Sequence, residues 1–129
     1  MPHQIFIVED HPIMRQAYAN VLDREPDLDL CGTSASAEEA LETLKEVSCD
    51  LVVVDVSLPG MDGLAFTERF LKMKPETLVL IISGHDEAVL GDRARRAGAR
   101  AYLTKKGLGR MLAGAIRKEL HSGLSSSTY

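Results

Sequence analysis

Three acidic residues follow apolar runs of the chain and could together hold a metal ion. Glu9 and Asp10 follow the run 5–8, and Asp55 follows the run 51–54. Short apolar runs of this kind predict buried β-strands, and open α/β sheets bind ligands at the carboxyl ends of their strands. Neighbouring carboxylates repel each other unless a cation lies among them, and hard ions such as Mg²⁺ prefer oxygen ligands. The pattern therefore predicts a divalent cation beside one available aspartate, Asp55.

Two further polar groups follow apolar runs and complete a recognisable set. Ser83 comes after the run 78–82, and Lys105 comes after the segment 100–104. Taken alone, Ser83 would be interpreted as a turn residue and Lys105 as a solvated charge. Phosphoryl transfer to an aspartate requires acids that hold a cation, a hydroxyl group and an ammonium group, and all of these are present. The cation and the ammonium offset the charge of the phosphoryl group, and the hydroxyl donates a hydrogen bond to a phosphoryl oxygen. The sequence indicates phosphoryl transfer to Asp55.

Strands and helices that alternate five times must position these residues. Strands are expected at 4–8, 27–33, 51–55, 78–82 and 100–104, and helices at about 11–24, 36–47, 62–74, 87–97 and 108–120. Candidate helix caps are Asp10, Ser36 and Asp62. This alternation predicts an α/β fold, a (βα)₅ doubly wound parallel sheet of five strands in the order 2-1-3-4-5. The half-polar second strand should lie at an edge, and 122–129 should form a flexible tail or a linker after a domain spanning 1–121.

Size and composition exclude several other classes of protein. The chain has 129 residues, 45% of them hydrophobic, and a formal net charge of −4, which suits one globular domain and does not indicate a nucleic-acid-binding surface. No apolar run approaches the length of a membrane span, and the first residues lack the pattern of a secretion signal, so a cytoplasmic protein without membrane contact is expected. Cys31 and Cys49 are then expected to be reduced thiols.

The segments that carry these residues resemble the response-regulator receiver domain of two-component signalling, over about residues 4–121. The resemblance lies in the acidic pair Glu9-Asp10, in the segment 55–63 (Asp-Val-Ser-Leu-Pro-Gly-Met-Asp-Gly), in Ser83-Gly84, and in 102–106 (Tyr-Leu-Thr-Lys-Lys). The segments 9–12 and 102–106 are similar to those of the subfamily with a LuxR/NarL-type helix-turn-helix output. The resemblance implies a flavodoxin/CheY-like fold. Lys106 stands where many receivers have proline, and the sequence leaves the geometry of the Lys105–Lys106 peptide bond open.

What the resemblance implies about function can be assigned residue by residue. It implies that Asp55 accepts the phosphoryl group, that Lys105 and Ser83 assist, and that Ser83 and Tyr102 form a switch. It also implies that Mg²⁺ is held by Glu9, Asp10, Asp55 and the backbone carbonyl of Ser57, and that Ser57 and His85 tune the dephosphorylation rate. The implied partners are a sensor histidine kinase, a second copy of the chain in a phosphorylation-dependent dimer, and DNA only through an output domain. The implied protein is a switch and not an enzyme beyond its own phosphorylation and dephosphorylation.

Two rival functions remain to be compared with this one. An aspartate-nucleophile phosphohydrolase would need a second acid two residues after Asp55 as general acid and base, and that position is Ser57. A flavodoxin-like nucleotide or flavin binder would need a phosphate-binding loop rich in Gly, Ser or Thr after the first strand, where this chain has the acidic segment 9–12.

Overall fold

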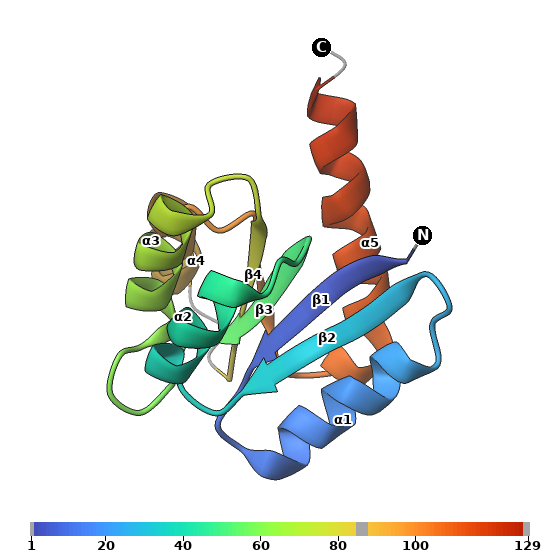
Figure 1. The fold of residues 1–129 in the computed structure, drawn as a ribbon, viewed down its shortest axis with the longest axis horizontal. Helices are drawn as coiled ribbons and strands as arrows, with labels where there is room; N and C mark the ends of the chain where they lie inside the picture. Colours follow the sequence, from blue (N-terminus) through green and yellow to red (C-terminus); the bar gives the residue numbers. More distant parts are fainter. Residues whose placement is uncertain (1, 85–87, 128–129) are drawn as a thin grey trace.

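The computed structural model describes residues 2–84 and 88–127, and it contains a five-stranded parallel sheet. The strands are β1 (His3–Val8), β2 (Leu28–Ser34), β3 (Leu51–Asp55), β4 (Leu78–Ser83) and β5 (Ala101–Thr104). Their order is β2-β1-β3-β4-β5, which confirms the predicted topology and the edge position of the half-polar second strand (Figure 1). The carboxyl ends of β1, β3, β4 and β5 are consequently neighbours.

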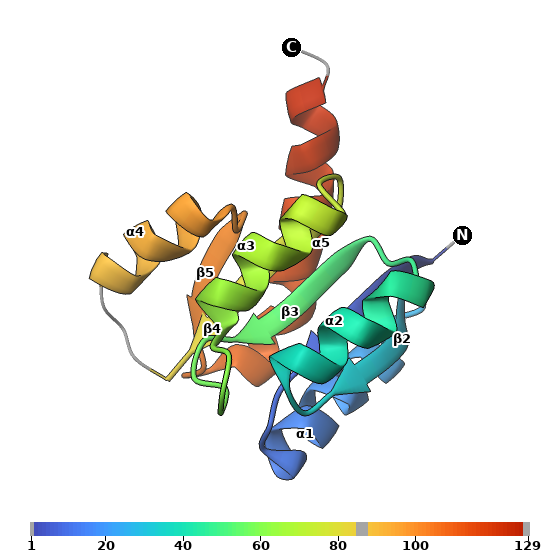
Figure 2. The same cartoon turned by 60° about the vertical axis from the view of Figure 1, so that its left-hand side comes forward.

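Five helices cover the two faces of the sheet. They are α1 (Pro12–Asp23), α2 (Ala37–Glu46), α3 (Gly63–Met73), α4 (Ala88–Ala97) and α5 (Leu108–Ser127). Helices α1 and α5 contact each other on one face, whereas α3 lies between α2 and α4 on the other (Figures 1 and 2). The arrangement is the doubly wound α/β fold that the alternation of elements predicts.

Alternate residues of the central strands pack into two separate hydrophobic cores, one on each face of the sheet. The α1–α5 core contains Leu51 and Val53 of β3, together with Leu112 and Ile116 of α5. The α2–α4 core contains Val52 and Val54 of β3, together with apolar side chains of α2, α3 and α4, namely Ala40, Leu44, Phe66, Phe70 and Ala94. The residues of β3 are buried throughout, as expected for a central parallel strand covered on both faces.

Two of the three predicted helix caps are confirmed and one is wrong. Ser36 Oγ accepts a hydrogen bond from Glu39 N at 3.2 Å, and Asp62 Oδ1 accepts one from Ala65 N at 2.8 Å. Asp10 does not cap α1, because the N-cap position is occupied by His11, whose side chain makes no capping hydrogen bond. The imidazole instead contacts the neighbouring acids, and Pro12 at the start of the helix removes one backbone donor that would otherwise need a partner.

The last helix is longer than expected. The sequence pattern predicts its end near Leu120, followed by a tail, but α5 continues to Ser127 and extends past the sheet (Figure 1). Extending an existing helix is easier than starting one, and a single glycine costs only about 1 kcal/mol. Arg117 ties α5 to the segment before β2 through ion pairs with Glu25 and Asp27. Among the described residues, no helix combines the length and the apolar content that a membrane crossing requires.

Candidate phosphoryl-acceptor site

Two buried carboxylates and one ammonium group meet at the carboxyl edge of the sheet. Glu9 follows β1, Asp55 ends β3 and Lys105 follows β5, so adjacent parallel strands deliver all three to the same edge. Lys105 Nζ donates a hydrogen bond to Asp55 Oδ2 at 2.8 Å and lies 3.0 Å from Glu9 Oε1. The side chains of Glu9 and Asp55 have no exposed surface, whereas that of Lys105 is 19% exposed. The structure thus brings together the three residues that the sequence analysis places at strand ends.

Burial and proximity shift the pKa values of these groups. Burial raises the pKa of Glu9 above its usual range and the charge of Asp55 raises it further, and these effects outweigh the contact with Lys105. Burial by itself lowers the pKa of Lys105, but the contacts with Asp55 and Glu9 raise it more, and the net change is upward. Lys105 is therefore an ammonium at neutral pH, and this single cation faces two buried carboxyl groups.

Asp10 and His11 extend the acidic group toward solvent. His11 Nδ1 lies 3.1 Å from Glu9 Oε2 and 3.3 Å from Asp10 Oδ1. Arg15 of α1 donates a hydrogen bond to the backbone carbonyl of Glu9 at 2.8 Å, which fixes the turn between β1 and α1. His11 is not among the residues that the sequence predicts at this site. The run Glu-Asp-His at a strand-to-helix turn is the signal that would have pointed to it.

The chemistry of this cluster fits a divalent cation. One ligand atom from each of Glu9, Asp10, His11 and Asp55 lies within 4.8 Å of the others. Glu9 Oε1 and Asp10 Oδ1 are buried atoms whose nearest cationic groups, Lys105 Nζ at 3.0 Å and the His11 imidazole at 3.3 Å, do not form well-aligned hydrogen bonds with them. Carboxylate oxygens are the ligands that Mg²⁺ takes. Glu9, Asp10 and Asp55 could hold such an ion, and the part of the Ser57 carbonyl in this site stays a prediction.

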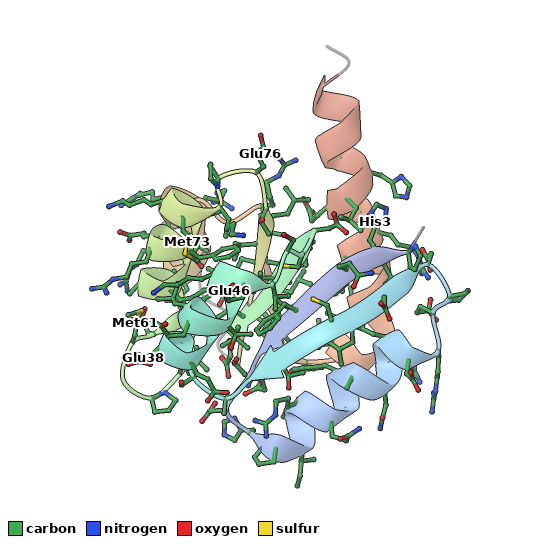
Figure 3. All side chains as sticks on the ribbon, in the orientation of Figure 1. His3, Glu38, Glu46, Met61, Met73 and Glu76 are labelled. Atoms are coloured by element: carbon green, nitrogen blue, oxygen red, sulfur yellow. The ribbon has the colours of Figure 1, made fainter. Side chains whose placement is uncertain are left out.

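The loop after Asp55 is held in place by contacts with its own strand and with α2. Ser57 N donates a hydrogen bond to Asp55 Oδ1 at 3.0 Å, and the Ser57 side chain is exposed. Met61 N donates to Glu38 Oε2 at 3.2 Å, and Figure 3 shows these two side chains close together. Gly60 has a φ of +73°, and a Cβ there would lie 2.8 Å from Glu38 Oε2. Glycine is required at this position, which keeps the loop folded back beside α2.

Helix α3 begins in direct contact with the backbone at the end of β3. Gly63 N donates a hydrogen bond to Val56 O at 3.0 Å. A Cβ atom at Gly63 would lie 2.5 Å from the carbonyl oxygen of Asp55 and 2.8 Å from Val56 Cα. No side chain fits in this space, so the main chain of Asp55 is confined by the first turn of α3.

The predicted switch residues lie on the strands beside Asp55. Ser83 is the last residue of β4 and is fully buried, and its carbonyl accepts a hydrogen bond from Lys105 N at 2.7 Å. Tyr102 of β5 is half-buried and packs against the α2–α4 core, with its Cδ2 3.8 Å from where a Cβ of Gly91 would lie. His85 lies outside the described residues. The peptide bonds of the described residues are all trans, and the bond between Lys105 and the residue after it is one of these.

Tyr18 is a polar residue near the site that the sequence analysis does not identify. Its side chain is 1% exposed in the α1–α5 core, and its hydroxyl makes no hydrogen bond to any described residue. Burial raises its pKa to about 12, and the charges of Lys105, Glu9 and Asp55 also act on it. In a sequence, a tyrosine on an apolar helix face that lies near a functional site cannot be distinguished from one that only packs in the core.

Comparison with protein families is consistent with this geometry. Residues 5–117 match the response regulator receiver domain, a match over well more than half of the chain. The DNA-binding transcriptional activator DevR/DosR of Mycobacterium tuberculosis is 33% identical over 95% of this chain and 56% of its own length. A protein-glutamate methylesterase/protein-glutamine glutaminase of Syntrophus aciditrophicus is 34% identical over 79% of this chain and 30% of its own length.

A solved structure shows the same fold in full. The crystal structure of a LuxR-family two-component response regulator from Aurantimonas sp. SI85-9A1 superposes with a TM-score of 0.89 and 31% sequence identity, covering 95% of this chain and 87% of that one. The chain spans between about a quarter and just over half of the length of the curated relatives it matches. The match over residues 5–117 and these similarities show that the chain belongs to the response regulator receiver domain family.

Proposed function

We propose that the domain is switched by a phosphoryl group that Asp55 accepts from a phosphohistidine of a sensor histidine kinase. An Asp55 carboxylate oxygen attacks phosphorus, the bond between phosphorus and the histidine nitrogen breaks, and that nitrogen keeps the electron pair and takes up a proton. The observation that carries the proposal is the position of Lys105 Nζ, 2.8 Å from Asp55 Oδ2 and 3.0 Å from Glu9 Oε1. An ammonium group fixed there offsets the negative charge of the incoming phosphoryl oxygens.

The acidic residues would contribute to phosphoryl transfer by binding a metal ion. Glu9, Asp10, Asp55 and the Ser57 carbonyl would hold Mg²⁺, which when bound neutralises phosphoryl charge. The buried oxygens of Glu9 and Asp10 that accept no hydrogen bond from described residues support this assignment. Asp10→Ala should weaken Mg²⁺ binding and prevent phosphorylation without unfolding the domain, because the Asp10 side chain is 27% exposed and does not cap α1.

The conformational response would pass through Ser83, Tyr102 and α4. The Ser83 hydroxyl would move toward a phosphoryl oxygen on Asp55, which leaves space for the Tyr102 ring. The Tyr102 ring lies beside α4, where a Cβ atom on Gly91 would be 3.8 Å from its Cδ2, so a change in the ring would change the surface made by α4, β5 and α5. Ser57, which is exposed two residues after Asp55, and His85 would adjust how water reaches the acyl phosphate and so set its lifetime.

The partners follow from the family and remain part of the proposal. A sensor kinase would donate the phosphoryl group in the cytoplasm, and phosphorylation would favour a dimer. Relatives of this chain include a DNA-binding transcriptional activator and a protein-glutamate methylesterase. We propose a transcriptional output through a separate DNA-binding domain, because the segments 9–12 and 102–106 are similar to those of LuxR/NarL-type regulators. The receiver itself would catalyse only its own phosphorylation and dephosphorylation.

The rival functions are not favoured. Ser57 occupies the place where a phosphohydrolase has its second acid, and its hydroxyl cannot act as a general acid and base there. The turn after β1 places two acids and His11 where a flavodoxin-like protein would bind phosphate. This cluster suits a cation and not an unaccompanied anion.

Acetyl phosphate with Mg²⁺ provides the test. The wild-type domain should gain one base-labile acyl phosphate, detected as an intact-mass shift, and Asp55→Asn should abolish it. Asp62→Asn is the matched control, because Asp62 lies in the same loop region and asparagine caps α3 as well as aspartate does. Labelling that persists in Asp55→Asn would place the acceptor elsewhere.

A further inference from the structure

The two cysteines of the chain come from the two strands that flank β1, and both pack on the same face of the sheet. Cys31 belongs to β2, and Cys49 lies two residues before the start of β3. Strand β1 separates these strands (Figure 1). Both side chains are partly buried against the α2–α4 core, and both are free thiols. Because the chain has two cysteines in all, each is the only partner that the other has within one molecule.

A β-bulge determines where the Cys31 side chain lies. Ile5 of β1 pairs with Leu30, whereas the next residue, Phe6, pairs with Gly32, so Cys31 is the extra residue of the bulge. Glycine at position 32 leaves room for the Phe6 ring, since a Cβ atom there would lie 2.8 Å from Phe6 Cε2. Cys31 Sγ donates a hydrogen bond to Ile5 O at 3.4 Å, which holds the thiol against β1, the strand between the two cysteines.

The two thiol groups interact directly with each other, and the interaction makes them unequal. The hydrogen bond from Cys49 lowers the pKa of Cys31, whereas the same contact, together with burial, raises the pKa of Cys49 above its usual range. A negative charge is therefore more stable on the Cys31 sulfur, while Cys49 keeps its proton. In such a pair the thiolate is the nucleophile toward an oxidant, and the neighbouring thiol attacks the first product to form a disulfide.

A cavity gives small molecules access to this part of the molecule. Cys49 is one of the residues that line a cavity of about 410 Å³, together with Phe70 and Met73 of α3 and the loop residues Asp50 and Thr77. The two loop residues precede β3 and β4, so the cavity lies at the edge of the sheet opposite the candidate phosphoryl-acceptor site. A small oxidant can therefore reach the cysteines without entering that site.

We propose that Cys31 and Cys49 are an oxidation site at which hydrogen peroxide forms a reversible disulfide. The Cys31 thiolate attacks one peroxide oxygen, the O–O bond breaks, hydroxide leaves, and Cys31 becomes a sulfenic acid. The Cys49 sulfur then attacks the Cys31 sulfur, the S–O bond breaks, and the departing hydroxyl takes the Cys49 proton and leaves as water. The proton that Cys31 lost on ionisation converts the hydroxide to a second water. Two thiols are thus oxidised and one peroxide is reduced, and the new bond closes the segment 31–49, which contains α2.

Thiol counting and intact mass on the full chain give the direct test. The reduced protein is treated with hydrogen peroxide, and its remaining thiols are alkylated with iodoacetamide under denaturing conditions. Oxidised wild type should lose the mass of two hydrogen atoms, take up no alkyl group, and yield proteolytic peptides joined through residues 31 and 49. Dithiothreitol should restore both thiols. Oxidation of the five methionines is distinguished because it adds oxygen and leaves the thiol count unchanged.

Serine variants test the two roles. Cys49→Ser keeps a hydroxyl donor beside Cys31, so the sulfenic acid should accumulate on Cys31 and be trapped by dimedone. In the folded state, the remaining thiol of Cys31→Ser should react with iodoacetamide at least about threefold more slowly than that of Cys49→Ser. The reason is that each unit of pKa changes the thiolate fraction about tenfold and the nucleophilicity about threefold in the opposite direction.

The same oxidation of wild type unfolded in urea is the matched control, and it needs no variant that must fold. The disulfide should form at least about tenfold faster in the folded chain, because the fold holds the two sulfur atoms together before they react. Equal rates in the folded and unfolded chains would overturn the proposal. So would two alkylated thiols after peroxide treatment of the folded chain, or disulfides between chains in place of one within each chain.

Discussion

Gly91 lies inside α4 on the side that faces the Tyr102 ring, and replacing it with alanine tests whether α4 is the least stable element of the domain. Gly91 is buried, and a Cβ atom there would lie 3.8 Å from Tyr102 Cδ2 and 4.0 Å from Arg95 Nη1. Both separations are ordinary van der Waals contacts, so the added methyl group fits without displacing the backbone of α4.

The expected magnitude follows from the helix position. Alanine is about 1 kcal/mol more favourable than glycine in a helix interior. Gly91→Ala should therefore raise the free energy of unfolding by about 1 kcal/mol and the Tm by roughly 3–5 °C for a domain of this size. Local opening of α4 should become about fivefold rarer, because 1.4 kcal/mol corresponds to about a tenfold change in an equilibrium.

Hydrogen exchange measured by mass spectrometry, with and without Mg²⁺ and beryllofluoride, gives the local readout. Gly114→Ala is the matched control, because Gly114 is an exposed glycine inside α5 and an added Cβ would meet nothing within 4 Å. The control should gain similar stability while leaving exchange in α4 unchanged. Beryllofluoride should alter protection across the segment 83–102 in wild type, and less so in Gly91→Ala.

Two results would refute this reasoning. A lower Tm for Gly91→Ala would mean that the Tyr102 ring cannot accept the methyl group. Beryllofluoride-dependent protection that appears elsewhere but not across the segment 83–102 would mean that α4 is not the element that responds to the acceptor site.

Three further predictions concern stability and the acceptor loop. Tyr18→Phe should raise the free energy of unfolding by about 1 kcal/mol, because it removes a buried hydroxyl that makes no hydrogen bond to described residues; a lower Tm in thermal unfolding would contradict this. The hydrogen bond from Arg117 lowers the pKa of Asp27 to about 2, so its stabilisation is present above the unfolded pKa of about 3.9 and is lost as pH falls toward 2. Arg117→Ala should accordingly flatten the dependence of the urea midpoint on pH between about 4 and 2, and an unchanged slope would exclude this pair as the cause. Gly63→Ala should destabilise the domain by about 1–3 kcal/mol and slow acetyl phosphate labelling, because its Cβ would lie 2.5 Å from the carbonyl oxygen of Asp55; wild-type labelling kinetics would show that the backbone adapts freely.

The fold was predictable because local pattern and tertiary packing agree along most of the chain. The run Leu51–Asp55 is apolar up to its last residue, and it forms the central strand with the predicted bounds. Ser36 and Asp62 cap their helices because both have extended backbone at the N-cap, so that the side-chain oxygen accepts from the amide three residues later. Asp10 does not cap α1 because the helix begins at Pro12, which places His11 and not Asp10 at the N-cap position. The end of α5 was placed too early, since a glycine and several serines are only weak helix breakers.

The candidate site was predictable from the sequence only for the residues that lie at the ends of strands. Parallel strands carry Glu9, Asp55 and Lys105 to one edge, so their meeting follows from the topology. The contacts of His11 and the buried hydroxyl of Tyr18 depend on how a helix is rotated and on which rotamer its side chains adopt. Hydrophobic periodicity gives the buried face of a helix but does not give those orientations.

The separation of the two cores places the candidate acceptor Asp55 and the proposed switch residue Tyr102 toward different faces of the sheet. Asp55 continues the alternation of Leu51 and Val53, which belong to the α1–α5 core, whereas Tyr102 packs against the α2–α4 core. Random mutagenesis with separate selections for phosphoryl acceptance and for downstream output should therefore sort core substitutions by the face of the sheet. Variants in the α1–α5 core would lose both traits, whereas many in the α2–α4 core would still accept phosphoryl groups while failing to signal. Under the proposed function, substitutions on the exposed side of α4 could change the partner of such a domain while Asp55, Glu9 and Lys105 keep their contacts.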